Sequence, residues 1–242
     1  MTARDRAQAG QMAEPLRVGA ERALKALNVD GAESHVLMPI AGSQGPPSQH
    51  GRVVPDGLSN GVKLGGFDAA VEVTVPAGQP LSALVGCLEE VPESAGHVLD
   101  LARSAAVAGT DVVILEGDAP IRLVYGMKRK PGTTHRDFCR YWETRYTSVT
   151  RFTPGLVGYY QLHADPHASR RAARAAGVGR HDLDGVALLW YRSLDDFAAA
   201  AALVGPLVPH AGSPVPFKDR AVAEERRFSD LNQVTAIVAA EI

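Results

Sequence analysis

A short polar row interrupts an otherwise apolar stretch, LVGYYQLHA at residues 156–164. Side chains alternate along a strand, so Tyr159, Gln161 and His163 share one face. A histidine exchanges protons near neutral pH, and a tyrosine hydroxyl can hold a substrate oxygen. The row therefore predicts the wall of a cavity for acid–base chemistry, with His163 and Tyr159 as catalytic residues. The alternative is a polar face that a neighbouring strand or solvent satisfies.

A second pair of chemically useful residues lies in the N-terminal half. The segments 29–41 and 67–75 both read as strands, and they carry His35 and Glu72. Two strands that form an antiparallel hairpin would make these residues neighbours across the sheet. A carboxylate beside an imidazole fixes its tautomer and raises its basicity. We predict His35 and Glu72 as a catalytic pair, with an ordinary surface ion pair as the alternative.

Aromatic residues form the third group. Phe138 and Trp142 follow helical spacing, so packing in a core is their simplest role. Tyr146 and Tyr159 differ, because a buried phenol needs a hydrogen-bond partner. In a mostly apolar pocket that partner can be a ligand carbonyl or phenol, which makes both tyrosines candidate catalytic donors. The predicted substrate-binding residues are Tyr125, Trp142, Gln161 and Trp190.

The composition argues against several classes of function. The 242 residues are 45% hydrophobic and carry a formal net charge of −2, so nothing in the totals suggests a nucleic-acid footprint. A small molecule is the expected partner. The Gly-rich stretches lack the G-x-G-x-x-G pattern of nucleotide sites, and His163, His167 and His181 lack metal-ligand spacing. We predict neither a metal nor a nucleotide cofactor.

The chain shows no targeting signal. Residues 1–20 mix charges, Gln and Gly without an apolar core, unlike a signal peptide or a membrane anchor. No stretch approaches the roughly 18 apolar residues of a membrane span. Cys87 and Cys139 each lie in an apolar helical pattern, which favours buried thiols, and neither has a catalytic partner that the sequence pattern reveals. These features predict a cytoplasmic protein that binds no membrane.

The C-terminal half alternates strands and helices. Thr134 with Asp137, and Ser193 with Asp196, fit the capping boxes that open two helices. The expected strands are 121–128, 156–164, 185–191 and 234–242. The resulting order βαββαβ is the ferredoxin-like motif, in which two helices cover one face of a four-stranded antiparallel sheet.

The N-terminal half carries a fainter copy of this order. Its expected elements are helices at 15–27 and 80–91 and strands at 29–41, 67–75 and 110–117. An opening strand is not evident in this copy. The internal repeat predicts an α+β chain of two fused ferredoxin-like repeats that form an α/β barrel. We place a degenerate first repeat at residues 1–119 and the second at 120–242.

Three motifs of the C-terminal half resemble one known family. They are LVYGMKRKPGTTHRDFCRYW at 123–142, PGLVGYYQLH at 154–163 and DGVALLWYRSLDDF at 184–197. Together they are similar to the EthD-type branch of the dimeric α/β barrel superfamily, over about the last 120 residues. The resemblance implies ferredoxin-like sheets that close into a barrel, usually by dimerisation. A tandem duplication could form that barrel within one chain, and a homodimer stays open as well.

The resemblance also implies a class of function. Related members include cofactor-independent polyketide cyclases, decarboxylases, anthrone oxygenases and lactone isomerases. We therefore expect a cofactor-independent enzyme that moves protons on a small aromatic or polyketide-like substrate in the barrel cavity. The outcome would be cyclisation, dehydration, isomerisation or decarboxylation. His163 or His35 would be the base, Tyr146 and Tyr159 the hydrogen-bond donors, and Glu72 the orienting carboxylate.

Two departures from the family pattern support other functions. Tyr146 stands where such proteins often carry a histidine, and Leu188 where they often carry an acid, whereas His163 matches the family position. The departures favour a non-catalytic small-molecule-binding or accessory protein. Since other members of the superfamily bind haem, a further alternative is a haem-dependent or cofactor-free oxygenase, with a strand or helix histidine as axial ligand.

Overall fold

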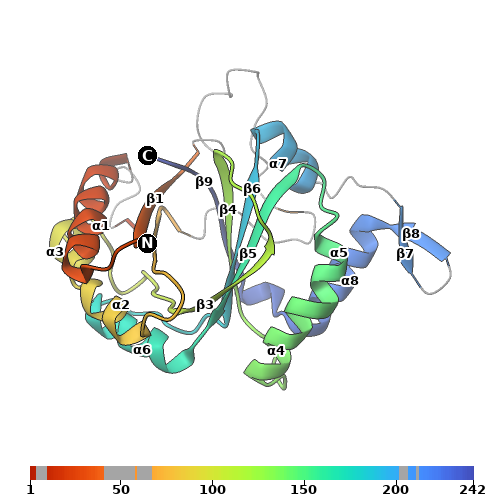
Figure 1. The fold of residues 1–242 in the computed structure, drawn as a ribbon. Helices are drawn as coiled ribbons and strands as arrows, with labels where there is room; N and C mark the ends of the chain where they lie inside the picture. Colours follow the sequence, from red (N-terminus) through yellow and green to blue (C-terminus); the bar gives the residue numbers. More distant parts are fainter. Residues whose placement is uncertain (4–9, 41–57, 59–66, 202–206, 211–212) are drawn as a thin grey trace.

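The computed structural model describes residues 1–3, 10–40, 58, 67–201, 207–210 and 213–242, which form a mixed α+β fold (Figure 1). The strands are β1 (Glu33–Pro39), β2 (Ala70–Thr74), β3 (Gly109–Leu115), β4 (Ile121–Met127), β5 (Leu156–Ala164), β6 (Gly185–Tyr191), β7 (Leu207–His210), β8 (Ser213–Pro216) and β9 (Thr235–Glu241). The helices are α1 (Ala13–Leu27), α2 (Leu81–Cys87), α3 (Glu90–Ala95), α4 (His135–Tyr141), α5 (Thr147–Thr150), α6 (Pro166–Ala175), α7 (Leu194–Ala201) and α8 (Phe217–Phe228). A π-helical segment, η2 (Trp142–Tyr146), joins α4 to α5, and a short 3₁₀ turn, η3 (Leu231–Gln233), precedes β9.

Seven strands form one antiparallel sheet in the order β2-β1-β9-β4-β6-β5-β3. The run β9-β4-β6-β5 is the strand order of a ferredoxin-like unit, which confirms the motif predicted for the C-terminal half. The sheet extends at both edges with strands of the N-terminal half: β1 pairs with β9, and β3 pairs with β5. Strands from both halves of the chain therefore share one sheet.

The sheet curls so strongly that its two outer strands face one hollow. Glu72 of β2 and Asp111 of β3 line the same cavity, although five strands separate β2 from β3 in the sheet. In the view of Figure 1, helices α1, α2, α3 and α6 lie to the left of the central strands, and α4, α5 and α8 lie to their right. The result is an open barrel with helices outside its convex face, as the fold prediction required.

The predicted duplication is not confirmed. In the N-terminal half β1, β2, α2 and β3 occur in the expected order, but the described residues contain no counterpart of the opening strand β4. The barrel consequently stays open between β2 and β3, where that strand would lie. The two repeats at 1–119 and 120–242 remain a prediction.

Local sequence signals set the starts of the helices. The Thr134 hydroxyl accepts the backbone N–H of Asp137, and the Ser193 hydroxyl accepts that of Asp196, as the two capping boxes predicted. The polar connection after β5 folds into α6, whose first turn is capped by Asp165 through the N–H groups of His167 and Ala168.

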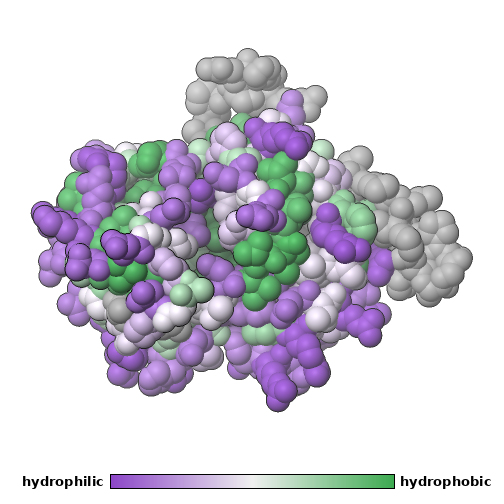
Figure 2. Space-filling view, viewed as in Figure 1, coloured by the Kyte–Doolittle hydropathy of each residue, from purple (hydrophilic) through white to green (hydrophobic). Residues whose placement is uncertain are grey.

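The largest hydrophobic core lies between the convex face of the C-terminal unit and its helices. Leu123, Tyr125 and Met127 of β4 pack there against Phe138 and Trp142. A separate core joins α1 and α3 to β1. Figure 2 shows hydrophobic residues gathered over the central strands on one face of the molecule. Among the described helices, none combines the length and the apolar character that a bilayer crossing needs.

Candidate functional site

A cavity of about 90 Å³ lies between the convex face of the sheet and the helices of the C-terminal unit; we call it the helix-side cavity. Most of its walls are apolar, from β4, β6 and α7. A few polar side chains converge on it. These are Tyr125, Tyr146, Tyr159, Thr150, Thr153 and Glu225. A mostly apolar space with a few convergent polar groups is typical of small-molecule sites.

Glu225 is the most unusual of these residues. It lies on α8 and is only 2% exposed. Phe217 and Ala221 precede it at intervals of four on the same helical face, and they line the same cavity. The hydroxyl of Tyr125 donates a hydrogen bond of 2.6 Å to its Oε1. A buried carboxylate therefore faces the cavity beside a phenol that fixes its position.

Tyr159 offers a hydrogen-bond donor on the same cavity wall. Its oxygen accepts the indole N–H of Trp142 at 2.8 Å and the amide N–H of Gln161 at 2.9 Å. Both partners can only donate through these nitrogens, so the hydroxyl hydrogen of Tyr159 goes to another acceptor. The Thr150 hydroxyl, a further hydrogen-bond partner of this phenol, can take that hydrogen, and a ligand oxygen would replace it. Burial raises the pKa of Tyr159 to about 12, and the phenol keeps that hydrogen at neutral pH.

Gln161 and His163 position this phenol. The Nε2 of His163 lies 3.0 Å from the amide oxygen of Gln161, which orients the amide nitrogen towards Tyr159 and towards the hydroxyl of Thr147. The imidazole ring also stacks on Trp142, with 5.2 Å between ring centroids. Burial lowers the pKa of His163, so the neutral ring is favoured. The predicted polar row is thus a hydrogen-bonded chain that ends at the cavity.

The π-helical segment η2 brings Trp142 and Tyr146 to this cavity. The Trp142 carbonyl accepts hydrogen bonds from the Thr147 hydroxyl at 2.9 Å and from the Gln161 amide at 3.4 Å, which supports the widened turn. Burial and the nearby Glu225 carboxylate raise the pKa of Tyr146 well above its ordinary value. A π-helical turn often marks a functional segment.

The structure divides the predicted site residues between the two faces of the sheet. Those on the convex, helix-covered face are Tyr125, Trp142, Tyr146, Tyr159, Gln161 and His163. The expectation that these residues face the hollow of the barrel is therefore wrong, because the α4–α5 segment packs on that side of β5. The residues on the concave face are His35, Glu72 and Trp190. Their catalytic and binding roles remain predictions.

Charged residues cluster at one end of the concave face. His35 lies opposite Glu72 in the pairing of β1 with β2, as predicted. The carboxylate that contacts the imidazole, however, is Glu241, with 2.7 Å between Oε1 and Nδ1. The side chain of Arg122, 6% exposed, reaches Glu72 at 3.3 Å and Glu241 at 3.0 Å and lies over the ring of Trp190. This cluster borders a second cavity, of about 560 Å³, which we call the barrel cavity.

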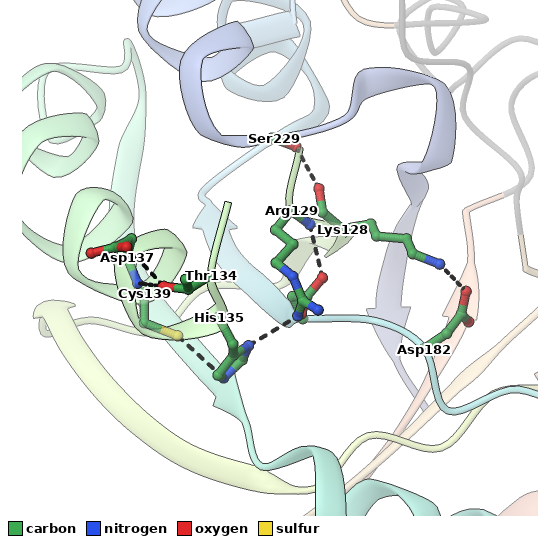
Figure 3. A network of polar contacts seen from close by, with 9 residues as sticks. Lys128, Arg129, Thr134, His135, Asp137, Cys139, Asp182 and Ser229 are labelled. Atoms are coloured by element: carbon green, nitrogen blue, oxygen red, sulfur yellow. Dashed lines mark hydrogen bonds and ion pairs between the residues drawn. The ribbon is translucent and has the colours of Figure 1, made fainter. Parts of the chain in front are cut away.

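A third polar cluster surrounds Asp184, the residue directly before β6, and Figure 3 labels its partners Arg129 and His135. Arg129 and His135 both contact its carboxylate, and the Nε2 of His135 lies 3.4 Å from the sulfur of Cys139. Cys139 and His135 are one helical turn apart, a pairing that the sequence pattern had not revealed. Burial, with Asp184 nearby, raises the pKa of Cys139 to about 11, which disfavours the nucleophilic thiolate.

The side chains of the helix-side cavity do not fit a haem. A volume of about 90 Å³ is far smaller than the macrocycle requires, and among the described residues no histidine lines either cavity. The described part of the chain also holds no group of three or more His, Cys, Asp or Glu side chains placed to bind a metal ion.

The sequence analysis missed Glu225, Arg122 and Glu241. A usable signal existed for Glu225, because Phe217, Ala221, Glu225 and Phe228 follow the spacing four, four and three of an apolar helical face. An acid in the middle of such a face is a candidate functional residue. Arg122 and Glu241 come together only through the pairing of β4 with β9, so their sequence positions gave no comparable signal.

Comparison with known proteins supports the C-terminal assignment. The sequence model of the EthD domain family matches residues 130–203, which include α4, η2, α5, β5 and β6. This segment supplies Trp142, Tyr146 and Tyr159 to the helix-side cavity. No curated protein matches the chain.

Proposed function

We propose that this chain is a cofactor-independent enzyme that transfers protons on a small aromatic or polyketide-like molecule in the helix-side cavity. The observation that carries the proposal is the 2% exposed carboxylate of Glu225, held by the hydroxyl of Tyr125 at 2.6 Å in a cavity that Tyr146 and Tyr159 also line. Burying a carboxylate is costly, so its position in an apolar pocket supports a role in chemistry.

The proposed reaction uses Glu225 as general base. Its carboxylate removes a proton from the carbon next to a substrate carbonyl, and the Tyr159 hydroxyl donates to the oxyanion that forms. The resulting enolate leads to isomerisation, or to cyclisation, dehydration or decarboxylation where the substrate carries the necessary group. Protonated Glu225 can return the proton, and the surrounding phenols and apolar walls keep water away. His163 acts as a positioning residue through Gln161.

The volume of the cavity restricts the substrate. About 90 Å³ accommodates a fragment no larger than one aromatic ring. A larger polyketide-like molecule would place only its reacting end in this space. The proposal therefore favours a small carbonyl compound whose enolisable carbon lies next to a ring or a short chain.

Deuterium uptake by simple ketones tests the proposal. Acetone, cyclohexanone and acetophenone form a series of increasing size, and ¹H NMR in D₂O follows exchange of the protons next to the carbonyl. We expect exchange with the native chain and a loss of about 10²–10⁴-fold in Glu225→Gln. Glu224→Gln is the matched control, because Glu224 lies on the same helix and pairs with Tyr141 outside the cavity. A Glu225→Gln variant at full rate, or no exchange with any ketone, contradicts the proposal.

A non-catalytic binding protein is the second candidate function. It is favoured by Tyr146, which lines this cavity and stands where related proteins often carry a histidine. A binder would hold the same ketones without exchanging their protons, and calorimetry beside the NMR assay separates the two functions.

A further inference from the structure

The barrel cavity is separate from the helix-side cavity because the sheet lies between them. Along β4, Leu123 and Tyr125 point towards the helices, whereas Val124 and Gly126 line the hollow. Apolar side chains from both halves of the chain form most of its wall. They include Leu37, Ala70, Val124, Leu162, Leu188 and Ile237. A volume of about 560 Å³ is within the range of small-molecule sites.

Polar groups line the cavity from several strands. Glu72 and Asp111 line it from the two outer strands of the sheet. Thr235 lines it from the start of β9, the opposite end of this strand from the Glu241 that contacts Arg122. The Oγ1 of Thr235 is buried and has no hydrogen-bond partner among the described residues. A buried, unpaired hydroxyl on a cavity wall points to a missing partner group.

The Glu72 end of the cavity has an excess of negative charge. The guanidinium of Arg122 is shared among three carboxylates there, those of Glu72, Glu241 and Asp118. Asp111 lies near enough to Glu72 to add to the repulsion. Burial raises the pKa of Glu72, so a cation that reaches this carboxylate recovers electrostatic energy that one shared guanidinium does not supply.

We propose that the barrel cavity is a second binding site of this chain, for an elongated, largely apolar molecule with a protonated amine at one end. The ammonium group pairs with Glu72, and the apolar body lies against Val124, Leu162 and Leu188. A polar group near the other end of the molecule pairs with the hydroxyl of Thr235. This site is independent of the acid–base chemistry proposed for the helix-side cavity.

Three probes of equal length and different charge test this assignment. Octylamine, octanol and octanoate share one apolar chain, and isothermal titration calorimetry compares their affinities. We expect octylamine to bind at least about tenfold more tightly than octanoate, because a carboxylate beside Glu72 is repelled.

Tryptophan fluorescence gives a second readout. In the Trp142→Phe variant, Trp190 is the only tryptophan of the chain, and the Cζ of Arg122 lies 5.2 Å from the centroid of its ring. Binding of octylamine should change the fluorescence of Trp190.

Variants locate the binding site. Val124→Phe and Ala70→Phe each fill the hollow and should weaken octylamine binding at least tenfold; the second covers the case in which the first fails to fold. Glu72→Gln should remove the preference for the amine. Tyr146→Phe, in the helix-side cavity, and Glu21→Gln, on the exposed face of α1, should bind as the native chain does. No binding of octylamine, equal binding of octanoate, or unchanged binding in both filled variants overturns the proposal.

Discussion

Glu72 and Glu225 lie on opposite faces of one sheet, and their neighbours give them different chemistry. Glu72 contacts the guanidinium of Arg122 at 3.3 Å. Burial raises its pKa, while Arg122 opposes the rise. The contacts of Glu225 include hydrogen bonds with the phenols of Tyr125 and Tyr146. The guanidinium is already committed to ion pairs, whereas Glu225 lines a cavity together with the phenols of Tyr146 and Tyr159. We therefore assign the acid–base step to Glu225.

His163 gives a pH-dependent prediction. Burial lowers its pKa in the folded chain below the ordinary value near 6.5. The folded state then binds this proton less readily than the unfolded state, and stability falls as pH drops through about 6.5 towards the folded-state pKa. Urea unfolding at about pH 7.5 and about pH 5.5 should show a larger loss of stability in the native chain than in His163→Asn. Equal losses in the two proteins would contradict the lowered pKa.

Sequence reasoning was more successful with local relations between residues than with distant ones. Strand alternation correctly put Tyr159, Gln161 and His163 on one face, because this depends only on the period of a strand. It did not identify which face the helices cover, since that depends on how the whole sheet curls. The hairpin register of His35 with Glu72 was predictable, but the approach of Glu241 to His35 was not, because the two residues are 206 positions apart.

At the scale of elements, the contact between η2 and β6 depends on Gly185. A Cβ atom at this position would lie 2.4 Å from the Trp142 ring and 2.8 Å from the Leu162 carbonyl oxygen. Gly185→Ala should therefore lower the free energy of unfolding by about 1–3 kcal/mol, as overpacking usually does. Urea denaturation measures the change. The control is Gly86→Ala in α2, where a Cβ meets no atom within 4 Å and stability should stay equal or rise. Equal stability of the two variants would show that η2 can shift without cost.

Helix starts were predictable because a capping box is a contact between neighbours in sequence, as at Thr134 and Ser193. The π-helical segment was not predictable. Its widened turn is supported by the Gln161 side chain, which reaches the Trp142 carbonyl from another element. Helix α8 was overlooked, although the interval between Phe217 and Ala221 continues to Glu225. The residues that surround Glu225, the proposed base, come from other elements, so only the tertiary structure identifies them.

At the scale of the whole molecule, the two halves contribute complementary edges to one sheet. Strand β1 covers the β9 edge of the C-terminal unit, and β3 covers its β5 edge. Each of these contacts joins a last strand of one half to a second strand of the other, in the strand order expected from the repeat. The pairing of the halves is therefore the arrangement that two identical ferredoxin-like units would use to close a barrel.

This pairing predicts the behaviour of the C-terminal half alone. A chain of residues 120–242 would expose the β5 and β9 edges that β3 and β1 now cover, and unpaired edges associate. We expect this fragment to form a homodimer in which β9 of one copy pairs with β5 of the other, while the full chain does not use these edges. Size-exclusion chromatography with light scattering measures the mass. The backbone of His163 faces β3, because its carbonyl oxygen lies against Gly109. His163→Pro therefore removes a backbone donor from the new interface and should give monomers. A stable monomeric fragment would show that the two halves do not pair as repeated units, and the boundary at residue 119 would then lose its support.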